Sequence, residues 1–189
     1  MIRRPPRSTR KESSAASDVY KRQNMDPAQV VNKGVCYVPQ TNNVFPTLTV
    51  QENLEMGAYI RNDDFRPRLL EIYEMFPPLA EKKKQAAGEL SGGQRQMVAM
   101  GKALMLEPTI LMLDEPTAGL SPIYRNEIFQ IIRQINASGV PILMVEQNAK
   151  QSLAVANRGY VLVDGRNRTT GKGIDLLNDP EIAKMFLGG

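Results

Sequence analysis

Four short apolar runs recur along the chain, and each ends in polar, proline or glycine residues. Several of their positions are β-branched, and the apolar residues follow one another without helical spacing. This pattern predicts buried β-strands. The runs are GVCYVPQ (34–40), TILMLDEP (109–116), VPILMVEQ (140–147) and RGYVLVDG (158–165).

Between and around these runs, apolar residues recur every three or four positions, which predicts helices. The helical patterns span residues 50–58, 66–76, 92–106, 123–136 and 151–156. Strands that alternate with helices of this length predict a parallel sheet covered by helices. Two local signals add to this: Asp164-Gly165 predicts a hairpin turn, and Asp179 before Pro180 predicts the start of the last helix.

The order of these elements predicts an α/β fold interrupted by a helical insert. Residues 41–105 hold three helical patterns and no convincing strand, so we expect a helical subdomain between two strands of the core. Residues 106–189 then form the C-terminal part of that core, and the whole domain spans residues 24–189. A length of 189 residues suits one domain, or most of one.

The charge of the chain is concentrated at its beginning. The net charge is +4 at pH 7, but residues 1–23 carry seven Lys/Arg and two Asp/Glu, so the remaining residues sum to −1. A basic patch for nucleic acid is therefore not expected on the folded body, and we expect no nucleic-acid partner. The single cysteine excludes an intrachain disulfide, and no apolar run reaches the roughly 18–20 residues of a membrane span.

Residues 1–23 are rich in Arg, Ser and Pro and poor in large apolar residues, so we expect this segment to be disordered. Three interpretations are open. A targeting peptide is disfavoured by the absence of an apolar central region, and a native disordered tail is the second possibility. We favour the third, a non-native segment, because it resembles translated non-coding sequence at the broken end of an assembled gene.

The stretch LSGGQ begins the helical pattern at residue 92 and has two interpretations. Ser91 and Gln94 are spaced as a capping box, which indicates a well-capped structural helix. Capping does not explain Gly92 and Gly93, since each glycine in a first helical turn costs about 1 kcal/mol relative to alanine. A phosphate close to the helix N-terminus would explain them. From these residues alone both interpretations stay open.

The run TILMLDEP places two neighbouring carboxylates, Asp114 and Glu115, at the C-terminal end of a buried strand. Ligands bind at such strand ends in open α/β sheets. One carboxylate can hold Mg²⁺, and the other can orient or deprotonate an attacking water. An ordinary strand end with a solvated Asp-Glu pair remains the alternative for this motif on its own.

LSGGQ followed some 20 residues later by an apolar strand ending in DEP resembles the ATP-binding subunits of ATP-binding cassette (ABC) transporters, from about residue 34 to 189. The resemblance implies a P-loop NTPase-like core with an inserted helical subdomain and a C-terminal β-hairpin. It identifies LSGGQ as the family signature, ILMLDE as the Walker B strand, AGLSP as the D-loop and Pro39-Gln40 as the Q-loop. VEQN, RGYVLVDG and FLGG look most like the LivF-type ATPases of branched-chain amino acid importers.

The resemblance also implies roles for single residues. Asp114 would organise Mg²⁺, Glu115 would be the general base for ATP hydrolysis, and Gln40 would sense both the metal and the attacking water. Gln147 occupies the position of the family's switch histidine; it can donate a hydrogen bond to phosphate but cannot titrate near neutrality. The signature residues that would contact ATP are Ser91, Gly92, Gly93 and Gln94.

The family's phosphate loop, G-x-x-x-x-G-K-[ST], does not occur in the 189 residues. The resemblance places that loop well upstream of Gln40, where the chain has only its N-terminal segment. We therefore expect a truncated domain that lacks the N-terminal strands and the Walker A loop and is inactive alone. A natural protein that dispenses with the loop is the alternative.

The expected partners follow from the same resemblance. Two ATPase subunits pack head to tail, as a homodimer or a heterodimer, so that each signature reaches ATP held by the other subunit. Membrane permeases would bind near the Gln40 loop and FPTLTVQENL, placing the chain peripherally at the cytoplasmic face of the inner membrane. Other open classes are a related amide or urea importer ATPase, a DNA-repair or chromosome-type ABC ATPase, which long heptad repeats would mark, and a non-catalytic interaction module.

Overall fold

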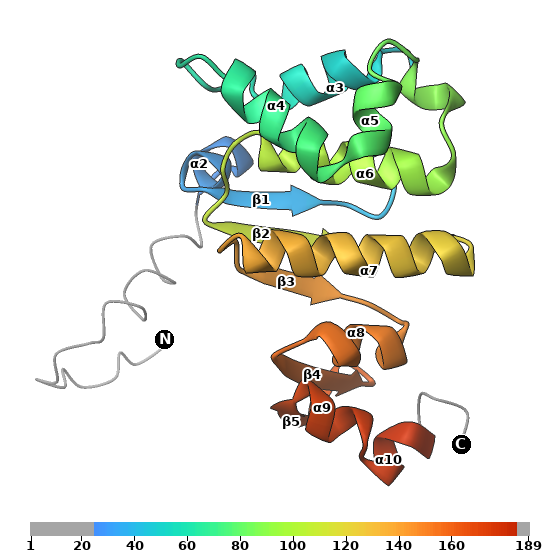
Figure 1. Ribbon diagram of the computed structural model, residues 1–189. Helices are drawn as coiled ribbons and strands as arrows, with labels where there is room; N and C mark the ends of the chain where they lie inside the picture. Colours follow the sequence, from blue (N-terminus) through green and yellow to red (C-terminus); the bar gives the residue numbers. More distant parts are fainter. Residues whose placement is uncertain (1–24, 185–189) are drawn as a thin grey trace, which may run out of the picture.

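The computed structural model describes residues 25–184 as an α/β fold in which a small parallel sheet carries helices on one face (Figure 1). Its strands are β1 (Val35–Val38), β2 (Ile110–Asp114) and β3 (Ile142–Val145), paired in the order β1-β2-β3. Both pairings are parallel, with Cys36 opposite Leu111 and Leu113 opposite Met144. The expected parallel sheet is confirmed. The segment 1–23, predicted to be disordered, lies outside the described residues.

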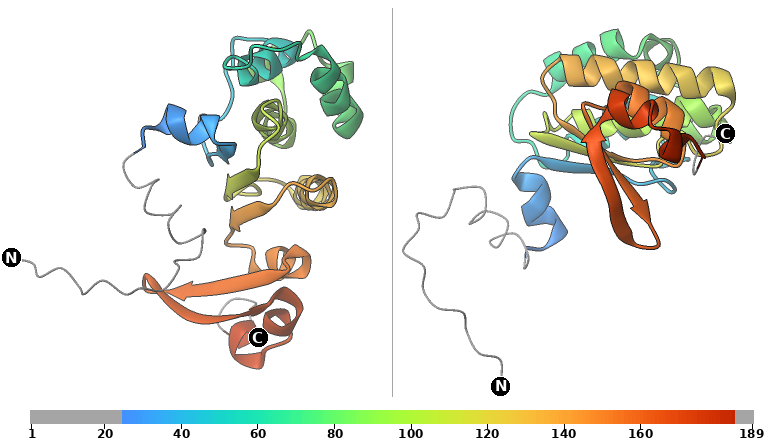
Figure 2. Two further views of the ribbon diagram at one scale, coloured as in Figure 1. Left: turned by 90° about the vertical axis from the view of Figure 1, so that its left-hand side faces the viewer. Right: turned by 90° about the horizontal axis from the view of Figure 1, so that it is seen from below.

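Alternation along the strands separates two faces of this sheet. One face is the core, where Leu111 and Leu113 of β2 pack under α6 (Gly92–Leu104) and α7 (Pro122–Ala137). Figure 2 shows both helices on the same side of the sheet. Successive side chains of a strand point to opposite faces, so the residues between these buried ones turn away from the core.

The region between β1 and β2 is helical, as the sequence predicts. It contains α3 (Val50–Gly57), α4 (Arg66–Met75), α5 (Pro77–Glu81), the 3₁₀ helix η1 (Ala87–Glu89) and α6. A buried core of Leu54, Ile72 and Leu79 joins these helices to α6. The short helix α5 was not predicted; it begins with Pro77, and proline is well suited to the first position of a helix.

The chain after β3 forms a separate small layer (Figure 1). It comprises α8 (Ala149–Val155), the hairpin β4 (Arg158–Val163) and β5 (Arg166–Lys172), α9 (Gly173–Leu177) and α10 (Pro180–Ile182). The hairpin turns at Asp164-Gly165, where both residues have positive φ, as the sequence predicts. Asp179 caps α10 by accepting from the Glu181 amide, which confirms the predicted helix start. Besides α5, two further helices were not predicted, α2 (Pro27–Asn32) and α9.

The second face of the sheet exposes apolar side chains. Tyr37 is 54% exposed, and on β3 Leu143 and Val145 are 49% and 61% exposed. Tyr37 and Leu143 both lie opposite Met112, so they share this face. We call Tyr37, Leu143 and Val145 the open sheet face. Exposed apolar side chains gathered on one face of a sheet favour association.

We expect the chain to bind an environment-sensitive hydrophobic dye strongly at the open sheet face. Replacing Leu143 and Val145 with Thr should lower dye fluorescence by about half or more, because threonine keeps strand propensity while removing apolar area. Ile174→Thr is the matched control, since Ile174 is an exposed apolar residue on α9, outside the sheet. Equal fluorescence in the parent and the double variant would contradict this expectation.

Candidate active site

The C-terminal ends of the three parallel strands bring three polar segments to one edge of the sheet (Figure 1). Gln40 follows β1, Glu115 follows β2 and Gln147 follows β3. Parallel strands run in the same direction, so the segments that leave them meet at one edge. The sheet therefore gathers side chains that are 75 and 32 residues apart in the chain.

Glu115 lies at the centre of this group. The side-chain amide of Gln40 donates to its Oε2 at 2.9 Å, and that of Gln147 donates to its Oε1 at 2.6 Å. The two amides hold the carboxylate from both sides without adding charge. A carboxylate fixed by neutral donors at a solvent-exposed edge can accept a proton from a water molecule. We call Gln40, Glu115 and Gln147 the Glu115 cluster.

The backbone of Glu115 is also held in an unusual conformation. Its φ is +44°, in the left-handed region that non-glycine residues seldom adopt. The Glu115 amide donates to the Val145 carbonyl at 2.8 Å, and the Ala118 amide donates to the Glu115 carbonyl at 3.0 Å. Residues in such conformations persist where their surroundings fix them, and they are concentrated at active sites. Here the fixed turn directs the Glu115 side chain toward both glutamines.

Asp114 has a partner that sequence analysis missed. The Tyr37 hydroxyl donates to Asp114 Oδ2 at 2.8 Å. This hydrogen bond, with a smaller contribution from burial and the negative charge of Asp114, raises the pKa of the Tyr37 hydroxyl above its usual value. Tyr37 lies opposite Met112, two residues before Asp114, so both side chains share one face. The alternation of β1 would have revealed the pair once the two strands were known to be neighbours.

The fit of this edge to Mg²⁺ rests on Asp114, whose Oδ1 takes part in none of the described hydrogen bonds. Within residues 25–184, no group of three or more His, Cys, Asp or Glu side chains is arranged to hold a metal. Magnesium in nucleotide sites is often held by one or two carboxylates, with waters and phosphate oxygens completing its shell. Asp114 therefore fits a magnesium ion that arrives with a nucleotide.

The LSGGQ segment, residues 90–94, which we call the signature turn, forms the predicted capping box at the start of α6. The Gln94 amide donates to Ser91 Oγ at 3.3 Å, and the Ser91 amide donates to Gln94 Oε1 at 3.2 Å. Among the described residues, the amides of Gly92 and Gly93 donate to no acceptor. No hydrogen bond of the described chain joins this turn to the Glu115 cluster. The predicted site residues therefore form two groups, one in this turn and one around Glu115.

The two glycines of the signature turn differ in their surroundings. A Cβ on Gly93 would overlap the ring of Tyr124 on α7, whereas a Cβ on Gly92 would meet only Leu120 Cδ2, at 3.3 Å. The sequence suggested a ligand as the reason for both glycines. At Gly93, packing within the chain already requires a glycine, so only Gly92 leaves open space for an approaching molecule.

Gly93→Ala is expected to destabilise the fold by about 1–3 kcal/mol, because the new methyl group overlaps the Tyr124 ring. Gly92→Ala is the matched control and should be neutral or slightly stabilising, since alanine favours a helix and Leu120 can move. The midpoints of urea denaturation measure both effects. Equal shifts for the two variants would show that the Tyr124 contact does not distinguish these positions.

The segment after β1 that carries Gln40 is hydrogen-bonded to α6 through Asn43. Asn43 Nδ2 donates to Gln96 Oε1 on α6 at 2.9 Å, and Lys102 Nζ, also on α6, donates to the Asn43 carbonyl at 2.6 Å. Burial lowers the pKa of Lys102, which also lies 4.8 Å above the centroid of the Phe45 ring. Sequence analysis missed these contacts, which no local pattern indicates.

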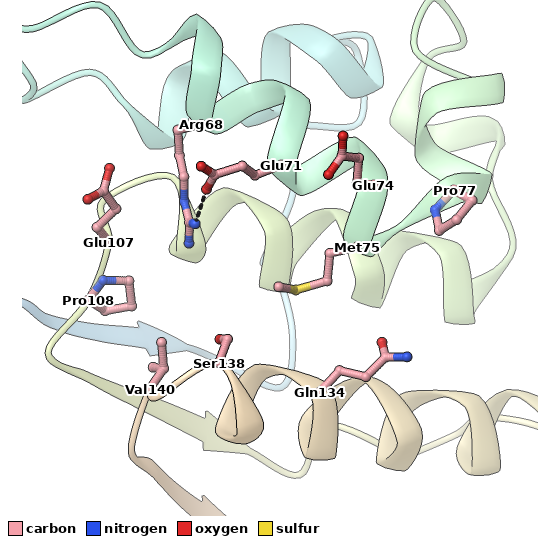
Figure 3. A pocket seen from close by; sticks show the side chains of 10 residues that line it. All are labelled: Arg68, Glu71, Glu74, Met75, Pro77, Glu107, Pro108, Gln134, Ser138 and Val140. Atoms are coloured by element: carbon pink, nitrogen blue, oxygen red, sulfur yellow. Dashed lines mark hydrogen bonds and ion pairs between the residues drawn. The ribbon is translucent and has the colours of Figure 1, made fainter.

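A pocket of about 680 Å³ lies away from the Glu115 cluster (Figure 3). Arg68, Glu71 and Met75 of α4 line one side of it, and Gln134 of α7 and Ser138, which follows that helix, line the other. It is also lined by residues that precede β2 and β3, which places it at the opposite ends of the strands from Glu115. No predicted site residue lines it.

Comparisons with known proteins agree on one family. The model of the family described as ABC transporter matches residues 9–118. A high-affinity branched-chain amino acid transport ATP-binding protein, BraG of Pseudomonas aeruginosa, is 44% identical over 161 residues, covering 85% of this chain and 69% of the relative. A probable branched-chain amino acid transport ATP-binding protein, LivF of Archaeoglobus fulgidus, is 40% identical over 167 residues, covering 87% and 71%.

Solved structures show the same fold. The ADP conformation of an ATP-binding cassette of an ABC transporter superposes with a TM-score of 0.75 at 27% sequence identity, covering 88% of this chain and 73% of that one. The predicted fold class is therefore confirmed. Within residues 25–184, no helix is both long and apolar enough to cross a membrane.

Proposed function

This chain belongs to the ABC transporter family of ATP-binding subunits, and we propose that it serves an importer of branched-chain amino acids. Support for the solute class comes from the names of relatives at 44% and 40% identity. Support for the chemistry comes from one observation above all: Glu115 is held between Gln40 and Gln147 at the strand ends.

In the proposed hydrolysis, Glu115 accepts a proton from the water that attacks the terminal phosphate of ATP. Gln40 and Gln147 keep both carboxylate oxygens oriented, and either amide can turn to donate to the water or the phosphate. Asp114 would hold Mg²⁺, which neutralises phosphate charge when it is bound. Tyr37 fixes the Asp114 side chain through its hydrogen bond to Oδ2.

The signature turn of one subunit would act on ATP bound by a second ATPase subunit. The amides of Gly92 and Gly93 lie at the N-terminus of a 13-residue helix, where the helix dipole favours a phosphate. Ser91 adds a hydroxyl and Gln94 a side-chain amide to the same turn. The separation of this turn from the Glu115 cluster suits a head-to-tail dimer, in which each ATP lies between two subunits.

A membrane permease would bind an apolar patch on the helical region. Exposed apolar side chains occur on α3, on α4, before α3 and between these two helices, and we call them the helical patch: Phe45, Met56, Tyr59, Ile60 and Leu70. Tyr59 is 80% exposed and Leu70 is 63% exposed, which suits a partner surface better than a solvated one. Docking there would place this chain peripherally at the cytoplasmic face of the membrane.

We also propose that the 189 residues alone neither bind nor hydrolyse ATP appreciably. In nucleotide-binding proteins with a G-x-x-x-x-G-K-[ST] loop, its backbone amides and lysine hold the β- and γ-phosphates, and the sequence contains no such motif. For ATP binding, the Glu115 cluster and the signature turn then need a phosphate loop in addition to the residues of this chain. For experiments, the extended chain is this sequence with a family phosphate-loop segment placed before Gly34.

The solute class is tested in vesicles that hold the extended chain together with its permeases and solute-binding protein. ATP hydrolysis should rise on addition of leucine, isoleucine or valine, because loaded binding protein engages the permeases. Urea at the same concentration is the control, since related importers carry amides. Stimulation by urea and not by leucine would assign the chain to that other class of importer.

A further inference from the structure

Glu146 is a half-buried carboxylate that none of the proposed catalytic steps uses. It follows β3 directly and precedes Gln147. Its Oε1 accepts from the Thr117 amide at 3.0 Å and from the Thr117 hydroxyl, and its Oε2 accepts from the Asn148 amide at 3.0 Å. One side chain thus receives three hydrogen bonds, two from the segment after β2 and one from its own segment.

The Thr117 end of this arrangement is buried and close to Glu115. Thr117 is 3% exposed, so its amide and hydroxyl need an acceptor within the protein. It belongs to the turn that begins with Glu115, in which the Ala118 amide donates to the Glu115 carbonyl. Both Thr117 donors have the same acceptor, Oε1 of Glu146.

The Asn148 end fixes the segment that carries the second glutamine. Gln147 lies between Glu146 and Asn148, and its carbonyl accepts from the Ala149 amide at 2.8 Å. The bond from Asn148 back to Glu146 therefore closes a tight turn around Gln147. Beyond the backbone bond from Glu115 to Val145, the Glu146 carboxylate is a side-chain link between the two turns that bear Glu115 and Gln147.

We propose that Glu146 is a positioning residue for ATP hydrolysis, which sets the Gln147 amide against the Glu115 carboxylate by tying their two turns together. The inference rests on the proposed function for its catalytic consequence, but the tie between the turns exists independently of nucleotide. Losing the carboxylate would leave the buried Thr117 donors without their acceptor and let the turn around Gln147 open. The 2.6 Å contact between Gln147 and Glu115 would then no longer be fixed.

Amide hydrogen exchange on the full chain tests the tie directly. In Glu146→Ala, the Thr117 and Asn148 amides should exchange at least about ten-fold faster, because exchange follows local opening. Amides in the middle of α6 and α7 should keep their parent rates. Glu146→Gln keeps one acceptor oxygen and should therefore free only one of the two amides. Glu81→Gln, at an exposed position on α5, is the matched control. Unchanged Thr117 and Asn148 rates in Glu146→Ala would overturn the inference.

Steady-state kinetics of the extended chain test the catalytic consequence. Glu146→Ala should lower kcat on the order of 10- to 100-fold and leave KM for ATP within about two-fold, as expected when an orienting contact is lost. In a Gln147→Ala background the same change should cost less than about three-fold, because the two residues act through one contact. Equal losses in both backgrounds would overturn the positioning role. An inactive parent would contradict the proposed function, while the exchange rates would still decide whether the tie exists.

Discussion

Glu115→Gln in the extended chain is expected to bind ATP as the parent does and to hydrolyse it about 10² to 10⁴ times more slowly, the usual effect of removing a positioned general base. Glutamine keeps the size of the side chain and one acceptor oxygen, so one of the two bonds from Gln40 and Gln147 can persist. The backbone turn should also be kept, since the bond from the Glu115 amide to Val145 does not involve the side chain.

Two measurements on the variant separate binding from chemistry. Equilibrium ATP binding should match the parent, while phosphate release under saturating ATP should nearly vanish. Glu81→Gln again serves as the control for a neutralised glutamate on the surface. Near-normal turnover by Glu115→Gln would remove Glu115 from the role of base, and the two glutamines around it would then need another explanation.

The strands and main helices could be predicted because their signals are local. The five helices predicted from apolar periodicity, including α6 and α7, are found within two residues of their expected bounds. The helix α2 was missed although it carries the signal that correctly placed α10, an Asp cap followed by Pro: Asp26 accepts from the Gln29 amide and Pro27 begins the helix. In this case the information was present in the sequence and was not used.

The contacts of the site depend on the order of the strands in the sheet. Local sequence patterns do not predict this order. Glu115 was predicted as a catalytic residue from its motif, but its bonds to Gln40 and Gln147 follow from the order of the sheet. The same holds for Tyr37, whose partner Asp114 lies 77 residues away. The role of Glu146 as an acceptor could not be predicted for a further reason, since it depends on the burial of Thr117.

The role of Gly93 shows the limit of an argument from residue type. Two adjacent glycines at a helix start suggested a ligand, and the family resemblance strengthened that interpretation. The ring of Tyr124 occupies the space beside Gly93, so packing alone accounts for one of the two. A glycine can indicate a close contact, but the sequence does not show whether the neighbour is a ligand or another side chain.

We propose that this chain supplies the hydrolytic carboxylate and the signature turn of an ABC ATPase but not the loop that holds the phosphates. The chain alone should therefore bind ATP with a Kd above about 1 mM, which corresponds to little binding free energy. The extended chain should bind ATP with a Kd in the micromolar range. An extended chain whose grafted loop carries Ala in place of its Lys is the control and should return to weak binding.

Equilibrium ATP binding to the chain and to the extended chain, with folding of both monitored by circular dichroism, is the most direct test. Weak binding by the chain and micromolar binding by the extended chain are the predicted results. Micromolar binding by the folded 189-residue chain as a monomer would contradict the account, because it would require a phosphate site elsewhere in these residues.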